Sequence, residues 1–268
     1  MEVFGYFSAL LIGLSLGLLG GGGSILAVPV LAYLFGLDEK MATAYSLFVV
    51  GCASLVGAMR QQQNGNIDGR TALVFGLPAV LGVWIVRHFV IPSLPDVLLT
   101  VAEFEFTRRM GMFGVFSLLM IWAAIFMLRP KEQKSGSGDV VFNFPAIFSE
   151  GLIVGGLTGF VGAGGGFLII PALVLFANLG IKKAIGTSLA IIAFKSLLGF
   201  LLGDAMDSVI DWSFLMAFTG LAILGIFAGV GLGGFIEGSK LKRFFGFFII
   251  AMACFIFTME FIIQPDYN

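Results

Sequence analysis

Apolar residues along the chain gather into eight long runs that are separated by short polar stretches. The runs are 3–35, 43–59, 72–91, 110–128, 145–177, 184–203, 213–235 and 244–263. Six of them have an ordinary length for a membrane-crossing helix, which needs about 20 predominantly apolar residues. The pattern therefore predicts an all-α, polytopic integral membrane protein.

The first and fifth runs are too long for a single straight crossing. As one continuous helix, each would extend about 50 Å, whereas the hydrocarbon core of a bilayer is about 30 Å thick. Each run also carries a cluster of glycines near its middle, at 20–23 and at 162–166. We therefore expect Gly-rich broken helices or re-entrant hairpins in these two runs.

The two halves of the chain match each other after a shift of 142 residues. The matched pairs include Gly13 with Gly155, Gly17 with Gly159, Gly20 with Gly162, Pro29 with Pro171 and Ser46 with Ser188. We predict a first transmembrane repeat of four segments over 1–128, a linker over 129–143 and a second repeat over 144–268. Duplicated membrane units with interrupted helices in matching positions are typical of transporters, although a purely structural bundle is the alternative.

Two foldings of the long runs are compatible with the pattern. If each run is one long kinked helix, the halves are parallel; if each is a hairpin, the repeats are inverted. Hairpins place ten Lys and Arg residues on one face and four on the other, and long helices give nine and five. Basic residues favour the cytoplasmic side, and the run length and glycine position also favour hairpins. We expect inverted repeats, a cytoplasmic linker and both termini outside.

A hairpin tip within the membrane must line a cavity or be buried in protein, because lipid cannot hydrogen-bond its backbone. Glycine allows such backbone to turn sharply and to approach a ligand closely. Helices that restart after the tips would direct unpaired N–H groups toward the centre of the protein, which favours an anion. The predicted substrate-binding backbone comprises Gly21, Gly22, Gly23, Ser24, Gly164, Gly165, Gly166 and Phe167.

Lys195 is a charged residue inside the sixth apolar run. An ammonium group near the middle of a membrane costs several kcal/mol unless it faces a cavity or a partner. We predict that Lys195 neutralises an anionic substrate or carries a coupling proton; snorkelling, or pairing with Asp204 or Asp207, is the alternative. Three hydroxyls can bond substrate oxygens or simply cap helices, namely those of Ser46, Thr187 and Ser188.

The composition fits a membrane protein and excludes several other classes. Hydrophobic residues make up 59% of the chain and charged residues 12%, and the mean hydropathy is +1.05, which excludes a soluble globular protein. A net charge of −1 provides no basic surface for nucleic acid. The two cysteines lie in apolar runs and the single histidine near a helix end, so we expect no metal, no cofactor and no enzymatic activity.

The two glycine clusters with Pro29 and Pro171, together with the motif Gly-Thr-Ser-Leu at 186–189, resemble the TauE/SafE family of sulfite and sulfonate exporters. The counterpart of this motif in the first half, at 44–47, keeps only Ser46 and Leu47. The resemblance covers essentially the whole chain. It implies transport of small sulfur-containing anions such as sulfite or sulfoacetate, coupled to protons, across the cell inner membrane.

The expected function is therefore a secondary active transporter that exports these anions by alternating access around a site near the midplane. A passive anion channel on the same fold is the main alternative, and an intramembrane enzyme is a weaker one. Glycines at every fourth position, at 151, 155 and 159 and at 225, 229 and 233, predict close helix packing. Such seams can also serve a homodimer interface.

Overall fold

The computed structural model describes residues 2–95, 97–101, 104–128, 144–161, 166–175, 177–201 and 210–263. The predicted linker, together with Gly164 and Gly165, lies outside these residues. The α-helices are α1 (Glu2–Leu19), α2 (Ser24–Pro29), α3 (Glu39–Gln63), α4 (Gly69–Ile85), α5 (Ile91–Ser93), α6 (Arg108–Leu128), α7 (Phe144–Val161), α8 (Gly166–Leu175), α9 (Ile181–Gly199), α10 (Trp212–Phe235) and α11 (Gly238–Thr258). Gly20–Gly23 forms the 3₁₀ turn η1, and π-helical turns lie at η2 (Val30–Leu34), η3 (Val86–Val90) and η5 (Met259–Ile263).

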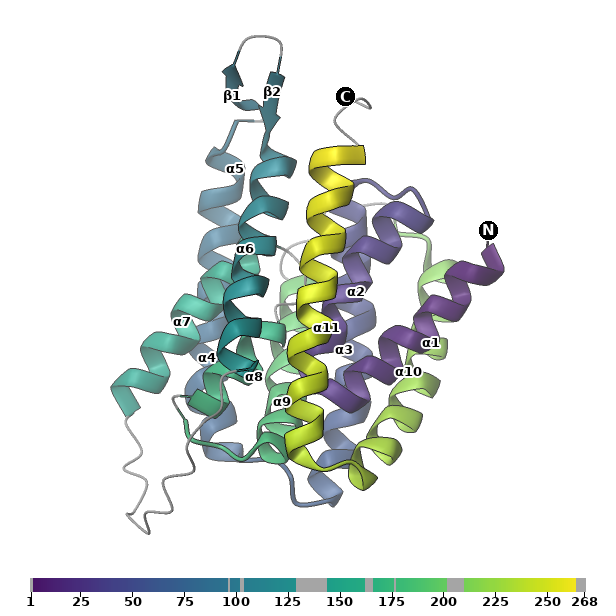
Figure 1. The fold of residues 1–268 in the computed structure, drawn as a ribbon, viewed down its shortest axis with the longest axis vertical. Helices are drawn as coiled ribbons and strands as arrows, with labels where there is room; N and C mark the ends of the chain where they lie inside the picture. Colours follow the sequence, from purple (N-terminus) through teal and green to yellow (C-terminus); the bar gives the residue numbers. More distant parts are fainter. Residues whose placement is uncertain are drawn as a thin grey trace.

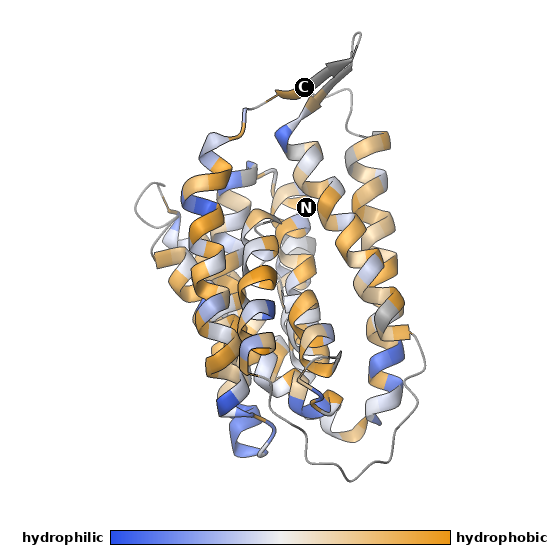
Figure 2. Ribbon diagram, turned by 90° about the vertical axis from the view of Figure 1, so that its left-hand side faces the viewer, coloured by the Kyte–Doolittle hydropathy of each residue, from blue (hydrophilic) through white to orange (hydrophobic). Residues whose placement is uncertain are grey.

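The long helices stand side by side in one bundle (Figure 1). Among the described residues, five stretches are long and apolar enough to cross a bilayer, namely Gly5–Leu34, Lys40–Gln63, Gly69–Ser93, Trp212–Phe235 and Gly238–Thr258. Figure 2 shows apolar residues along the length of the helices and many of the hydrophilic ones near their ends. The prediction of an all-α, polytopic membrane protein is confirmed.

The first long run folds back on itself at its glycines. The rings of Tyr6 and Phe35 are 6.2 Å apart between centroids, whereas 29 residues of continuous helix would separate them by about 44 Å. A Cβ atom on Gly5 would overlap the ring of Phe35. Helix α1 therefore descends to η1, and α2 returns beside it (Figure 1).

The second long run also begins and ends on the same side of the bundle. The guanidinium of Arg70 lies 5.7 Å from the ring centroid of Phe144, at the start of α7. Two residues away, the Asp68 N–H donates to the Thr187 hydroxyl, at 3.0 Å, near the start of α9. Since Asp68 and Arg70 belong to one turn, the chain between Phe144 and Thr187 must turn back.

The packing of the helices follows the two halves of the chain. Helix α1 packs against α10 and α4 against α7, while α3 packs against α9 and α6 against α11. The repeat equates α1 with α7 and α4 with α10, so the first two pairs are equivalent. Each half thus packs mainly on the other. The inverted relation of the repeats stays a prediction.

The glycines at every fourth position lie where helix backbones meet. A Cβ atom on Gly225 or Gly229 of α10 would overlap the backbone of Leu10 or Leu14 in α1, and one on Gly155 of α7 would overlap Ala79 in α4. Small residues permit this approach. The predicted close-packing role of these seams is confirmed.

Replacing Gly225 with alanine should destabilise the bundle by about 1–3 kcal/mol, because the methyl group has no room against the α1 backbone. Gly220 lies on the same helix with nothing within 4 Å of an added Cβ atom, so Gly220→Ala is the matched control. Thermal unfolding of the two purified variants in detergent measures the difference. Equal melting temperatures for both variants and the wild type would contradict the proposed seam.

A two-stranded β-hairpin follows α5, and the apolar pattern did not predict it. Strand β1 (Val97–Val101) pairs antiparallel with β2 (Phe104–Thr107), with Leu99 opposite Phe106 and Val101 opposite Phe104. The hairpin projects from one end of the bundle (Figure 1). It connects α5 to α6 and lies away from the glycine turns.

Candidate substrate site at the glycine tips

The glycine turn of the first long run meets the start of α8 inside the bundle. Gly21 of η1 and Gly166, the first residue of α8, pack backbone against backbone, so that a Cβ atom on either one would overlap the other residue. A Cβ atom on Gly166 would also lie 2.5 Å from the Ile192 Cδ1 atom on α9. We call Gly21 and Gly166 the glycine tips. The predicted convergence of the two turns is observed for these described residues.

Two serine hydroxyls bond the backbone of the glycine tips. The Gly21 N–H donates to the Ser188 Oγ atom at 3.4 Å, and the Gly166 N–H donates to the Ser24 Oγ atom at 3.3 Å. Both hydroxyls in turn donate to carbonyls, Ser24 to Gly21 at 2.7 Å and Ser188 to Ile185 at 2.8 Å. Each tip thus presents a backbone donor that a neutral hydroxyl, and no charged group, accepts.

The two glycine tips and the two serines that bond them, Ser24 and Ser188, form a tip cluster. This cluster lies where the two halves of the chain meet. Ser24 and Gly166, which share a hydrogen bond, are 142 residues apart, the same interval as the sequence repeat. A residue contacts its own equivalent only if both lie close to the axis that relates the two units. A ligand held between the tips would therefore contact both halves at once.

Three other predicted residues support the tips by packing. A Cβ atom on Gly22 would overlap the Phe245 ring, and one on Gly23 would overlap Ser15, so both glycines lie in close contact with these neighbours. The buried Phe167 ring packs on Phe116 with 5.2 Å between centroids. These contacts hold η1 and the start of α8 in place.

The two other candidate hydroxyls, those of Ser46 and Thr187, do not bond the glycine tips. The buried Ser46 Oγ atom has no hydrogen-bond partner among the described residues. Its repeat equivalent is Ser188, which bonds Gly21; the equivalent of Gly21 is residue 163, outside the described residues. Thr187 instead accepts from the Asp68 N–H, so its hydroxyl contacts the turn between α3 and α4.

Lys195 lies deep in the bundle beside the second tip. Its side chain is 2% exposed, and its Nζ atom donates to the Thr158 Oγ1 atom of α7 at 2.8 Å. The Thr158 hydroxyl donates to the Gly155 carbonyl at 3.0 Å. Lys195 is one helical turn beyond Ile192, which touches Gly166. The alternative partners Asp204 and Asp207 lie outside the described residues.

The buried charge around the tips is positive. Among the described residues, Lys195 is the one buried side chain that carries a formal charge, and the other buried polar side chains are Ser, Thr and Gln. No group of three His, Cys, Asp or Glu side chains in that part of the chain is placed to hold a metal ion. The chemistry available there is hydrogen-bond donation and positive charge, which suits an anion.

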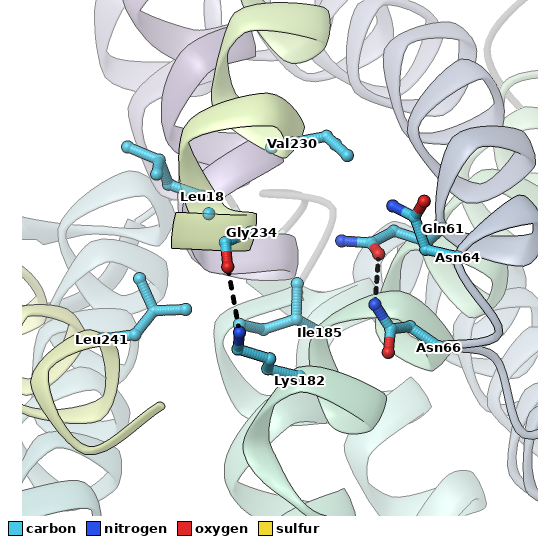
Figure 3. Close-up of a pocket in the computed structure, with 11 residues that line it drawn as sticks. Leu18, Gln61, Asn64, Asn66, Lys182, Ile185, Val230, Gly234 and Leu241 are labelled. Atoms are coloured by element: carbon cyan, nitrogen blue, oxygen red, sulfur yellow. Dashed lines mark hydrogen bonds between the residues drawn. The ribbon is translucent and has the colours of Figure 1, made fainter. Parts of the chain in front are cut away.

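A cavity of about 350 Å³ that the sequence did not predict is lined in part by Ile185, one helical turn before Ser188, whose hydroxyl bonds Gly21. Its polar lining is Gln61, Asn64, Asn66 and Lys182 (Figure 3). The signal that could have revealed it is the run from 61 to 66, Gln-Gln-Gln-Asn-Gly-Asn, which is rich in amides and has no charge. Polar, uncharged residues at a helix end next to an apolar run fit a water-accessible mouth.

Comparisons with known proteins give one consistent result. The family model described as "Sulfite exporter TauE/SafE" matches residues 6–256. A "Probable membrane transporter protein" of Xylella fastidiosa (strain 9a5c) is 32% identical over 259 residues, covering 92% of this chain and 91% of the relative. The "Probable membrane transporter protein YdhB" of Bacillus subtilis (strain 168) is 26% identical, covering 82% of this chain and 85% of the relative. No solved structure matches the chain.

Proposed function

Because this chain belongs to the TauE/SafE sulfite exporter family, we propose that it is a secondary active transporter that exports small sulfur-containing anions across the cytoplasmic membrane. Sulfite and short sulfonates such as sulfoacetate are the proposed substrates, and protons are the proposed coupling ion. The observation that carries the proposal is the contact of two glycine tips, one from each half of the chain, beside a buried lysine.

The tips suit an oxyanion because they offer donors without a carboxylate. Among the described residues, the N–H groups of Gly21 and Gly166 donate to hydroxyl oxygens alone, at 3.4 and 3.3 Å. These bonds are longer than the usual N–H···O distance of about 2.9 Å, which makes them weak. Because a charged oxygen is a stronger acceptor than a neutral hydroxyl, an oxyanion competes well for the same N–H groups. Lys195 lies one helical turn beyond Ile192, the residue that packs on Gly166, and it supplies the positive charge that a sulfur oxyanion needs after it leaves water.

The direct contact of the tips supports alternating access over an open channel. An anion cannot pass between Gly21 and Gly166 while their backbones touch, so passage requires the two hairpins to separate. Each hairpin belongs to a different half of the chain, and a relative movement of the halves would open the site to one side at a time. A passive channel would instead need a continuous polar path.

Lys195 is also the proposed link to protons. A buried ammonium and a bound anion stabilise each other, so binding of the proton and binding of the anion favour each other by the same factor. The coupling then has a definite sign, in which proton and anion move together. An outward gradient of the anion should carry protons outward and acidify the receiving compartment.

Binding by the purified protein tests this function. Sulfite, sulfoacetate, thiosulfate, sulfate and chloride are compared by thermal shift, and a native-state ligand at about 100 times its Kd adds about 2.7 kcal/mol of stability. We expect a shift from sulfite or sulfoacetate and none from chloride. Flux of the same anions into proteoliposomes, with exchange of internal for external label, distinguishes a transporter from a channel. The absence of any shift or flux with sulfur anions would overturn the proposal.

A further inference from the structure

The cavity beside the glycine tips is lined by five helices and one turn. Gly17 and Leu18 come from the end of α1, Gln61 from the end of α3, Asn64 and Asn66 from the turn after it, and Lys182 from the start of α9. The ends of α10 and α11 that face this side complete the wall (Figure 3). Ile185 is three residues before Ser188 on α9, about 4.5 Å along that helix, and Leu18 precedes Gly21 across the end of α1.

Gln61 has one oriented amide group at this cavity. The side chain is only 7% exposed, and its Oε1 atom accepts a bond of 2.9 Å from the Asn66 Nδ2 atom. Since the oxygen is engaged by Asn66, the NH₂ group takes the opposite direction. Figure 3 shows that nitrogen pointing into the cavity, toward Lys182 and Gly234. No described residue accepts a hydrogen bond from it.

Lys182 supplies positive charge on the facing wall. Its Nζ atom donates to the Gly234 carbonyl at 3.2 Å, and an ammonium group has two further donors. The cavity lining includes no carboxylate among the described residues. The helix ends around it carry the basic residues Arg60, Arg70, Lys182, Lys183, Lys240, Lys242 and Arg243, against the acidic residues Asp68 and Glu237. The field at this mouth therefore attracts anions.

The rest of the lining is apolar and the volume exceeds that of a bare oxyanion. Leu18, Ile185, Val230 and Leu241 face the same space of about 350 Å³, which lies within the range of small-molecule sites. Such a lining can hold a short carbon chain while the donors hold an anionic head group. Inorganic sulfite would use the donors and leave the apolar wall uncovered.

We propose that this cavity is an entry site that selects small organic anions with an oxyanion head and a short apolar body, such as alkylsulfonates. Lys182 and the Gln61 amide nitrogen hold the head group, and the ligand then moves one helical turn to the glycine tips. This inference rests on the proposed transport of sulfite and short sulfonates, and it adds the place at which the organic anions are first bound.

The test uses two substitutions in the full-length protein. Gln61→Glu keeps an oxygen for Asn66 and replaces the NH₂ donor with a carboxylate oxygen, whereas Lys182→Gln removes the charge. The control is Lys183→Gln, because Lys183 is the exposed neighbour that does not line the cavity. Apparent affinity for 1-propanesulfonate and for sulfite is measured by thermal shift, and KM and maximal rate by flux into proteoliposomes.

We expect each cavity variant to weaken propanesulfonate binding by about tenfold or more, the cost of losing a hydrogen bond to a charged group. KM should rise with little change in maximal rate, because the central site is intact. Lys183→Gln removes the same charge from the field but no contact from the cavity, so it should weaken binding much less than Lys182→Gln does. Wild-type affinity in both cavity variants would overturn the entry site alone. Equal losses for sulfite and propanesulfonate would overturn the organic class. A wild-type protein that neither binds nor transports any sulfur anion would overturn the proposed function itself.

Discussion

Replacing Gly21 with alanine is expected to reduce anion transport by about 5- to 150-fold. The backbone conformation of Gly21 is open to any residue, since the positive φ of this turn is at Gly20. The obstacle is the Gly166 backbone, which occupies the position of the new methyl group. Overpacking of this kind costs about 1–3 kcal/mol, and a penalty of that size, applied to the closed tips alone, lowers the equilibrium constant for their closure by the stated factor. Initial flux in proteoliposomes is the measurement.

The control for Gly21→Ala is Gly69→Ala. Gly69 begins α4 and has nothing within 4 Å of an added Cβ atom, so its alanine variant should transport at the wild-type rate. A melting temperature for each variant separates slow transport from unfolding. Wild-type flux by Gly21→Ala would mean that the tips need not close during transport.

Replacing Lys195 with methionine is expected to abolish the stabilisation by sulfur anions while raising the stability of the ligand-free protein. Methionine has a similar shape, and it removes a buried ammonium whose hydrogen-bond partner among the described residues is the neutral Thr158. Burial of such a charge costs several kcal/mol. The Thr158 hydroxyl still donates to the Gly155 carbonyl, so the substitution leaves no buried donor without an acceptor. Thermal unfolding with and without sulfite measures both effects.

The two effects of Lys195→Met separate a ligand-binding lysine from a structural one. A lysine that mainly ties α9 to α7 should leave the sulfite shift intact and lower the melting temperature when it is replaced. Thr158→Val provides the matched variant on the other helix, because it removes the hydroxyl and keeps the ammonium. We expect Thr158→Val to retain a sulfite shift.

Much of the fold could be predicted because length and glycine content act together. A run of apolar residues that is longer than the bilayer is thick must tilt, protrude or turn, and a glycine cluster at its centre selects the turn. The contact between Tyr6 and Phe35 confirms that choice for the first run. The resemblance to the TauE/SafE family, based on the same glycines, is confirmed by the match over residues 6–256.

The candidate site could be predicted only as far as the backbone defines it. Thr187 and Ser188 are neighbours in sequence but point about 100° apart on a helix, and no pattern says which one faces the tips. In the structure, the Ser188 hydroxyl accepts a hydrogen bond from the Gly21 N–H, and the Thr187 hydroxyl accepts one from the Asp68 N–H. The direction of the Gln61 amide could not be predicted from the sequence, because it depends on a hydrogen bond from Asn66 across a turn. The roles of these residues in binding stay predictions.

The hydrogen bond between Ser24 and Gly166 has an evolutionary consequence. If the two halves had once been separate, identical chains in a symmetric pair, a single residue type would have occupied both positions. Two serines would each bring a Cβ atom into the crowded centre, and two glycines would leave both N–H groups without the hydroxyl. Fusion into one chain allowed one half to keep a serine hydroxyl at this position and the other half to keep a glycine without a Cβ atom. Asymmetry at the centre is therefore a benefit that a symmetric pair of identical chains cannot have.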